Sequence, residues 1–191
     1  MAARKPEAEA QLYQLKVTLR GAKPPIWRRL QVPSDIPLSE LHVVLLIAMG
    51  WDGGHLHQFI KEQVYYGPVD PDLGMDDMED EKGVVLRDLL PHAKSKLIYE
   101  YDFGDSWEHE VLVEKVLAPE TNTRYPVCLD GARACPPEDC GGVWGYAELL
   151  KIMKDPKHEE YAERLEWLGE ELDPEAFDVA RVNAELQSRK P

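Results

Sequence analysis

The sequence lacks the features that mark membrane and secreted proteins. No apolar run approaches the ~20 residues that a membrane-spanning helix needs, and the longest, residues 41–51, is interrupted by His42. Residues 1–11 lack the apolar core of a signal peptide. The three cysteines are odd in number, so they cannot all form disulfides within the chain. We therefore expect a protein of the reducing cytoplasm that has no contact with a membrane.

Basic residues are also scarce, since 22 lysines and arginines stand against 36 aspartates and glutamates. The formal net charge of -14 would repel a phosphate backbone, so DNA is an unfavourable partner. Residues 1–32 are the exception, with seven basic residues against two acids. One hypothesis is therefore that the functional surface is this basic edge, around Arg20, Lys23, Arg28 and Arg29, and that it binds an acidic partner.

The remaining composition and patterning predict a packed domain of the α+β class. Hydrophobic residues make up 43% of the chain, which is enough for a core. Apolar side chains alternate along residues 13–21 and 26–32, as in the strands of a hairpin. An apolar helix over about 38–49 follows and ends at Gly50, and further strands come after it. This order favours a mixed, β-grasp-like sheet with a C-terminal helical segment packed on it.

We divide the chain into a solvated tail, residues 1–10, and a single domain, residues 11–191. The domain comprises a sheet-rich part (11–117), a loop that contains the sequence PPED (118–142) and a helical part (143–191). Residues 70–81 hold seven acids and no base, so we expect a solvent-exposed loop there.

The segment YDFGDSWEHEVLVE holds the first group of candidate site residues. Strand alternation places Trp107 and His109 on the apolar face of the sheet, toward a pocket or the core. Asp102 and Asp105 flank a glycine turn and can reach the rim of such a pocket. His57 approaches the same place if its strand joins this sheet. The alternative is architectural: aspartates in turns bond backbone amides, and buried Trp and His side chains fill a core.

The segment CLDGARACPPEDCGG holds the second group. Its cysteines, Cys128, Cys135 and Cys140, are spaced C-x6-C-x4-C and lack the C-x2-C pair of structural zinc sites. Cysteines from this segment would still complete a zinc tetrahedron with His57 and His109 if the loop folds back over the sheet. A divalent metal such as zinc is therefore one hypothesis for a cofactor.

Two prolines stiffen the same segment just ahead of Glu138 and Asp139. These carboxylates have two interpretations. They either accept hydrogen bonds from free N–H groups at the start of the helix that follows, or they are held over the sheet for a metal ion or a basic partner. Ser106 lies near His109, but no G-x-S-x-G elbow surrounds it, so no nucleophile–base pair is recognisable.

Three motifs together resemble the plasmid pRiA4b ORF-3-like family: YDFGDSWEHEVLVE, YPVCLDGARACPPEDCGGVWGY and GHLHQF. The resemblance extends over nearly the whole chain. It implies an α+β domain, found in plasmids and insertion elements, whose biochemical activity is not established. It also implies that the three motifs form one unit. The matching positions are His57, Tyr101, Asp102, Phe103, Gly104, Asp105, Trp107, His109, Cys128, Gly131, Pro136, Pro137, Glu138, Asp139, Gly141, Gly142 and Tyr146.

Our leading hypothesis is a binding or adaptor module that recognises a peptide, a protein or a small ligand through a polar pocket under the PPED loop. The candidate ligand-binding residues are His57, Tyr101, Asp102, Asp105, Trp107, His109, Glu138 and Asp139. The alternative is a metal-dependent hydrolytic enzyme, with metal ligands drawn from His57, His109, Cys128, Cys135 and Cys140 and from nearby carboxylates.

Overall fold

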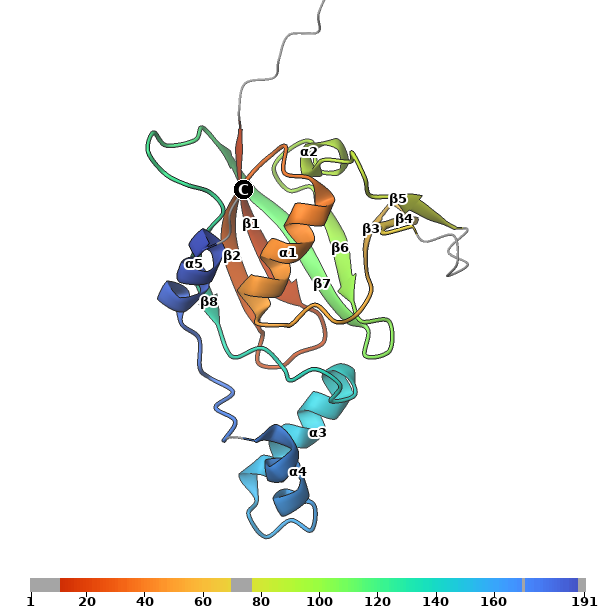
Figure 1. The fold of residues 1–191 in the computed structure, drawn as a ribbon, viewed down its shortest axis with the longest axis vertical. Helices are drawn as coiled ribbons and strands as arrows, with labels where there is room; N and C mark the ends of the chain where they lie inside the picture. The colour runs from red at the N-terminus through yellow and green to blue at the C-terminus, as the bar shows by residue number, and fades with distance from the viewer. Residues whose placement is uncertain (1–10, 70–76, 170, 189–191) are drawn as a thin grey trace, which may run out of the picture.

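The computed structural model describes residues 11–69, 77–169 and 171–188 as an α+β fold built on one eight-stranded sheet (Figure 1). The strand order is β5-β4-β3-β6-β7-β1-β2-β8, and neighbours pair antiparallel except for β4 and β5. The strands are β1 (Leu12–Leu19), β2 (Trp27–Pro33), β3 (His57–Lys61), β4 (Val64–Gly67), β5 (Met78–Asp80), β6 (Lys96–Tyr101), β7 (Trp107–Leu117) and β8 (Val127–Ala132).

Helix α1 (Leu38–Met49) lies across one face of this sheet and closes the core (Figure 1). Side chains alternate along β7, so that Trp107, His109, Val111 and Val113 are buried toward the helix, as predicted. The helix ends at Gly50, also as predicted, because Gly50 adopts the left-handed conformation and its N–H donates to the carbonyl of Leu46.

The order of hairpin, helix and further strands matches the prediction, and the sheet is mixed. The β-grasp likeness is not confirmed, since β1 and β7 pair antiparallel and belong to a larger, eight-stranded sheet. Two short strands lie where loops are predicted: β8 within residues 118–142, and β5 within the acidic segment 70–81. The pairing register between β2 and β8 shifts between Arg29 and Leu30. This shift explains why buried and exposed side chains do not simply alternate along β8. Residues 70–76 lie outside the described part.

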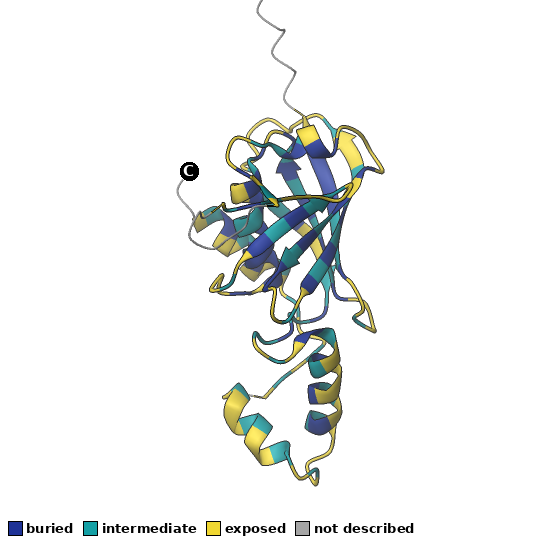
Figure 2. Ribbon diagram, turned by 90° about the vertical axis from the view of Figure 1, so that its right-hand side faces the viewer, coloured by how far each residue is buried: buried dark blue, intermediate teal, exposed yellow. Residues whose placement is uncertain are grey.

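The C-terminal helices divide into two groups. Helix α5 (Val179–Ser188) packs on β8 and α1 through Val182 and Leu186, as the predicted helical segment should. Helices α3 (Gly142–Lys154) and α4 (Tyr161–Leu168) instead extend beyond the end of the sheet and pack on each other (Figure 2). The remaining helix, α2 (Leu86–Leu89), lies earlier in the chain and is one short turn. Within the described residues, no helix is both long and apolar enough to cross a membrane.

Arg28 is a buried part of this fold and not a member of a basic surface. Its exposed fraction is 1%, and its guanidinium donates to the carbonyls of Ala48, at 2.6 Å, and Ala132, at 3.0 Å. It also lies over the ring of Phe177, 4.0 Å from the ring centroid. Arg28 thereby joins the end of α1 to β8. Its neighbour Arg29 forms an ion pair with a glutamate of β7, so the hypothesis of a free basic edge loses support.

We expect Arg28→Leu to lower the free energy of unfolding by about 3 kcal/mol, because buried carbonyls lose charge-assisted donors. The control is Arg29→Leu, which removes a partly exposed ion pair and should cost at most about 1 kcal/mol. Urea unfolding followed by tryptophan fluorescence measures both. Equal losses in the two variants would contradict the role given to Arg28.

Candidate functional site

The predicted site residues from the sheet gather at one end of β3, β6 and β7, on the face that α1 covers. The ladder pairs His57 with Tyr101, and Tyr101 with Trp107. One step along, Tyr99 pairs with His109. Partners in a ladder point to the same side of a sheet, so these rings form one continuous aromatic wall. Strand β6 separates β3 from β7, however, and its tyrosines therefore lie between His57 and His109.

Trp51, which follows the C-cap residue of α1, covers part of this wall. Its ring centroid lies 5.1 Å from that of Tyr101, 5.6 Å from that of Trp107 and 5.2 Å from that of His109. Its indole N–H donates to the carbonyl of Pro136, at 3.0 Å. Sequence reasoning missed Trp51, although a tryptophan just after a helix stop is a signal of packing. The residue ties the sheet to the segment 135–142, which we call the PPED segment.

The PPED segment lies against the end of β6 and the glycine turn (residues 102–106). The Tyr101 hydroxyl donates to Glu138 Oε1 at 2.8 Å, and burial together with this bond raises the pKa of Tyr101 to about 12. The backbone N–H of Gly141 donates to Asp105 Oδ2, at 3.2 Å. The structure thus brings Tyr101, Asp105 and Glu138 together. Trp51 and Glu138 lie over the wall where the sequence predicts a pocket.

Gly142 sets how closely the two segments approach. Its φ is +66°, and a Cβ at this position would lie 2.4 Å from the backbone oxygen of Asp105. Any larger residue would therefore push the PPED segment away from the glycine turn.

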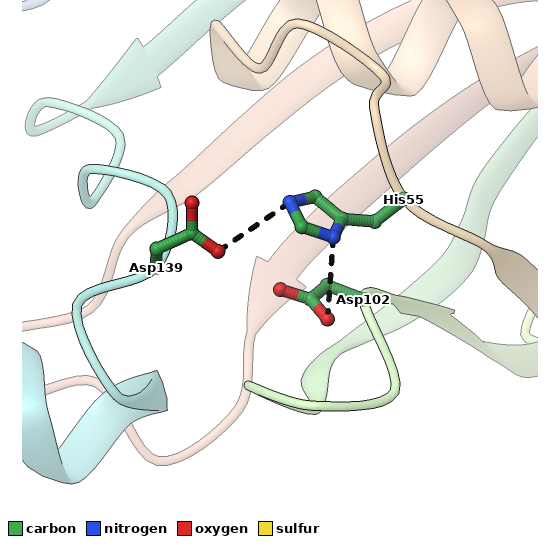
Figure 3. A group of neighbouring side chains, drawn as sticks. All are labelled: His55, Asp102 and Asp139. Atoms are coloured by element: carbon green, nitrogen blue, oxygen red, sulfur yellow. Dashed lines mark ion pairs between the residues drawn. The ribbon is translucent and has the colours of Figure 1, made fainter.

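A partly exposed polar group at this end of the sheet consists of His55, Asp102 and Asp139, which we call the His55 site (Figure 3). His55 precedes β3, Asp102 follows β6, and Asp139 belongs to the PPED segment. His55 Nδ1 lies 3.7 Å from Asp102 Oδ1, and His55 Nε2 lies 3.6 Å from Asp139 Oδ1. The side chains of His55, Asp102 and Asp139 are 31%, 10% and 73% exposed, respectively.

Each part of the His55 site is held differently. Asp102, at φ +57°, accepts the N–H of Gly104 at 2.9 Å. The His55 ring packs edge-on against Tyr101, with 5.8 Å between ring centroids. Among the described residues, Asp139 makes no hydrogen bond or ion pair except the ion pair with His55. Sequence reasoning selected both aspartates but missed His55, although the motif GHLHQF contains it.

His109 and Trp107 lie beneath this site as core residues. Both are fully buried, and in the described part of the chain neither the His109 ring nitrogens nor Trp107 Nε1 has a hydrogen-bond partner. Burial lowers the pKa of His109 to about 4, although the nearby backbone of Tyr99 and Trp107 acts in the opposite direction. His109 is therefore neutral at pH 7, and it packs under Trp51 without reaching the solvent.

His57 belongs to a separate buried pair. Its ring stacks on that of His42, with 3.5 Å between centroids, and its Nε2 lies 3.0 Å from Glu81 Oε2. His42 Nδ1 in turn lies 2.8 Å from the Tyr99 hydroxyl, and burial lowers the pKa of His42 to about 3. The expectation of an exposed loop is wrong for Glu81, which is 7% exposed, because the buried imidazole compensates its desolvation. Sequence reasoning missed His42 and Glu81.

The predicted zinc ligands do not come together. Among the described residues, the one group of three or more His, Cys, Asp or Glu ligand atoms close enough for a shared ion is the His55 site, which contains none of the five proposed zinc ligands. Those five are divided among the buried pair (His57), the core (His109), the edge strand β8 (Cys128) and the PPED segment (Cys135 and Cys140). Burial raises the pKa of each thiol, to about 12 for Cys140, so these cysteines stay protonated.

Fold and site together define an α+β protein with a polar cluster at one end of an eight-stranded sheet. The chain belongs to the family described as plasmid pRiA4b ORF-3-like protein, whose model matches residues 11–181, so the predicted membership is confirmed. A relative in Sinorhizobium fredii (strain NBRC 101917 / NGR234), uncharacterized protein y4hQ, is 39% identical over 91% of this chain and 90% of its own length.

A solved structure shows the same fold. The protein of unknown function MM3350 from Methanosarcina mazei Go1 is 38% identical, with a TM-score of 0.80 over 91% of this chain and 98% of that one. Neither relative's name states an activity, a ligand or a partner.

We expect His109 to make the fold sensitive to acid. The unfolded chain takes up a proton at this residue below about pH 6.5, and the folded chain only below about pH 4. The unfolded state therefore binds more protons between these values, and stability falls as the pH is lowered through them, by on the order of 3 kcal/mol in total. Urea unfolding at pH 7 and pH 4.5 should show His109→Leu gaining stability relative to the native chain at the lower pH. The exposed control His92→Leu should show a much smaller gain, and equal gains would rule out this cause.

Proposed function

We propose that this protein is a binding module that holds a positively charged group of its ligand at the His55 site. The observation that carries the proposal is the pairing of two carboxylates, Asp102 and Asp139, with one imidazole. Among the described residues, neither aspartate has an ion pair with a lysine or an arginine. One imidazole carries at most one positive charge, so the site keeps a net negative charge in either state of His55. Such a site attracts a cation.

The surroundings of the site support binding by a preformed surface. The three residues come from separate parts of the chain, and the contacts of Trp51 with Pro136 and of Tyr101 with Glu138 hold those parts together. A ligand that finds its partners already in place loses less conformational entropy on binding. The ligand class remains a peptide, a protein or a small molecule, now with an ammonium, guanidinium or metal cation as the bound group. Because the family description names a plasmid, a partner from a mobile element belongs to the proposal.

Catalysis by a side-chain nucleophile has less support. The Ser106 hydroxyl donates to Glu100, at 2.6 Å, and no histidine among the described residues contacts it. The three thiols are protonated because burial raises the pKa of each. The hydrolytic alternative predicted from the sequence therefore depends on a bound metal ion to activate water.

The test uses a fluorescently labelled hexalysine peptide, with hexaglutamate as the negative probe, in buffer that contains EDTA. We expect Asp139→Asn and Asp102→Asn to weaken hexalysine binding by about 10-fold, equivalent to about 1.4 kcal/mol. Asparagine keeps the size of both side chains and tolerates the left-handed backbone that both residues adopt. Fluorescence anisotropy measures the affinities.

The matched control is Asp130→Asn, which removes an exposed carboxylate of β8 that faces Arg29. It should change the affinity less than two-fold on the same scale. If Asp130→Asn and Asp102→Asn weaken hexalysine binding equally, the acidic surface as a whole is responsible, and the His55 site loses its role in binding an organic cation.

A further inference from the structure

We infer that the cation held at the His55 site is a divalent transition metal ion. This inference rests on the proposed function, since it names the ligand class of the same site. One ring nitrogen of His55 and one carboxylate oxygen from each of Asp102 and Asp139 lie within 4.8 Å of one another. Three side chains from three separate segments thus place metal-binding atoms near one another, with one carboxylate beside each ring nitrogen of His55 (Figure 3).

The donor set favours a metal over an organic cation and identifies the kind of metal. A neutral imidazole nitrogen binds a metal ion through its lone pair. An ammonium group can only donate a hydrogen bond to that lone pair. Zinc, manganese and iron accept a mixture of imidazole and carboxylate ligands, whereas calcium and magnesium select oxygen atoms alone. One imidazole with two carboxylates therefore fits a transition metal ion, and three protein ligands leave coordination positions for the ligand or for water.

The arrangement around His55 also resembles the support that metal-binding histidines receive. Both ring nitrogens face a carboxylate oxygen, at 3.7 Å toward Asp102 and at 3.6 Å toward Asp139. The ring itself rests on Tyr101, which Glu138 and Trp51 hold in place.

The site can close on an ion without a change of fold. Metal–ligand bonds of about 2.1 Å place neighbouring donor atoms about 3–3.5 Å apart. The separations found here, which reach 4.8 Å, must therefore shorten by up to about 1.5 Å. The side chain of Asp139 is 73% exposed, and within the described residues its one ion pair is with His55, so it is free to make this movement. Asp102 and His55 are fixed by their neighbours and provide the stationary side.

The other clusters of ligand-type residues do not compete with this site. His57 and His42 stack on each other, and Glu81 occupies the remaining side of His57. The cysteines are protonated and belong to no group of three ligand atoms among the described residues. The members of the His55 site, by contrast, are in part accessible to an ion from solution.

The test is isothermal titration of the chelator-treated full chain with ZnCl2 and with MnCl2, with CaCl2 as the oxygen-selective control. We expect one metal ion per chain for zinc or manganese, and weaker binding of calcium. His55→Gln and Asp139→Asn should each lower the affinity at least about 10-fold. Co²⁺ added in place of zinc should give a visible d–d absorption band that is lost in His55→Gln.

Two controls separate the site from incidental binding. His92→Gln removes an exposed histidine elsewhere, and Asp130→Asn an exposed carboxylate elsewhere, and both should bind as the native chain does. Near-ultraviolet circular dichroism shows that each variant is folded. Absence of a one-to-one zinc or manganese complex, or equal binding by the native chain and His55→Gln, overturns the inference.

The hexalysine assay in EDTA distinguishes this failure from failure of the proposed function. If no metal binds but Asp102→Asn still weakens hexalysine binding, the metal inference fails and the binding module stands. If neither metal nor hexalysine depends on the His55 site, both fail. If metal alone depends on it, the inference holds and the metal is the cation of the proposed function.

Discussion

The contact between the PPED segment and the start of the loop after α1 is the constraint on which the candidate site depends. The indole N–H of Trp51 is bound by the carbonyl of Pro136, and the Tyr101 hydroxyl by Glu138. Both bonds are made at the edge of an apolar wall, where water competes weakly and a lost partner is costly. They hold the PPED segment at a distance from which Asp139 meets His55. The diproline sequence adds to this by restricting the backbone of the segment before it docks.

The same wall divides the histidines by function. Burial makes His109 and His42 poor bases, with pKa values of about 4 and about 3, and both serve packing at neutral pH. His57 is buried too, but it gains a carboxylate partner in Glu81, which is thereby held against β3. His55, two residues earlier in the chain, lies before the strand and reaches the surface. The difference in environment comes from where the strand begins.

The periodicity of apolar residues predicted the regular strands and helices of the fold, but it failed for residues outside those elements. The buried face of β7, the hairpin and the end of α1 at Gly50 follow from alternation and from one glycine. His55 lies outside the alternation that positions His57, because β3 begins at His57. Trp51, His42 and Glu81 join the site region through tertiary contacts that no local pattern records. The motif likeness did better, because it linked segments that only the folded chain brings together.

An architectural explanation accounts for most of the polar residues but not for all. Asp105 accepts a backbone N–H of the PPED segment, and Glu138 accepts the Tyr101 hydroxyl, so each is needed where it lies whether or not a ligand binds. The side chain of Asp139 makes no hydrogen bond to another part of the described chain. It is exposed, and it adopts a left-handed backbone that an aspartate tolerates less well than glycine. If this position served the fold alone, glycine would adopt the same backbone conformation with less strain than aspartate. A carboxylate that contributes no support and faces the accessible histidine has its most direct explanation in a bound cation.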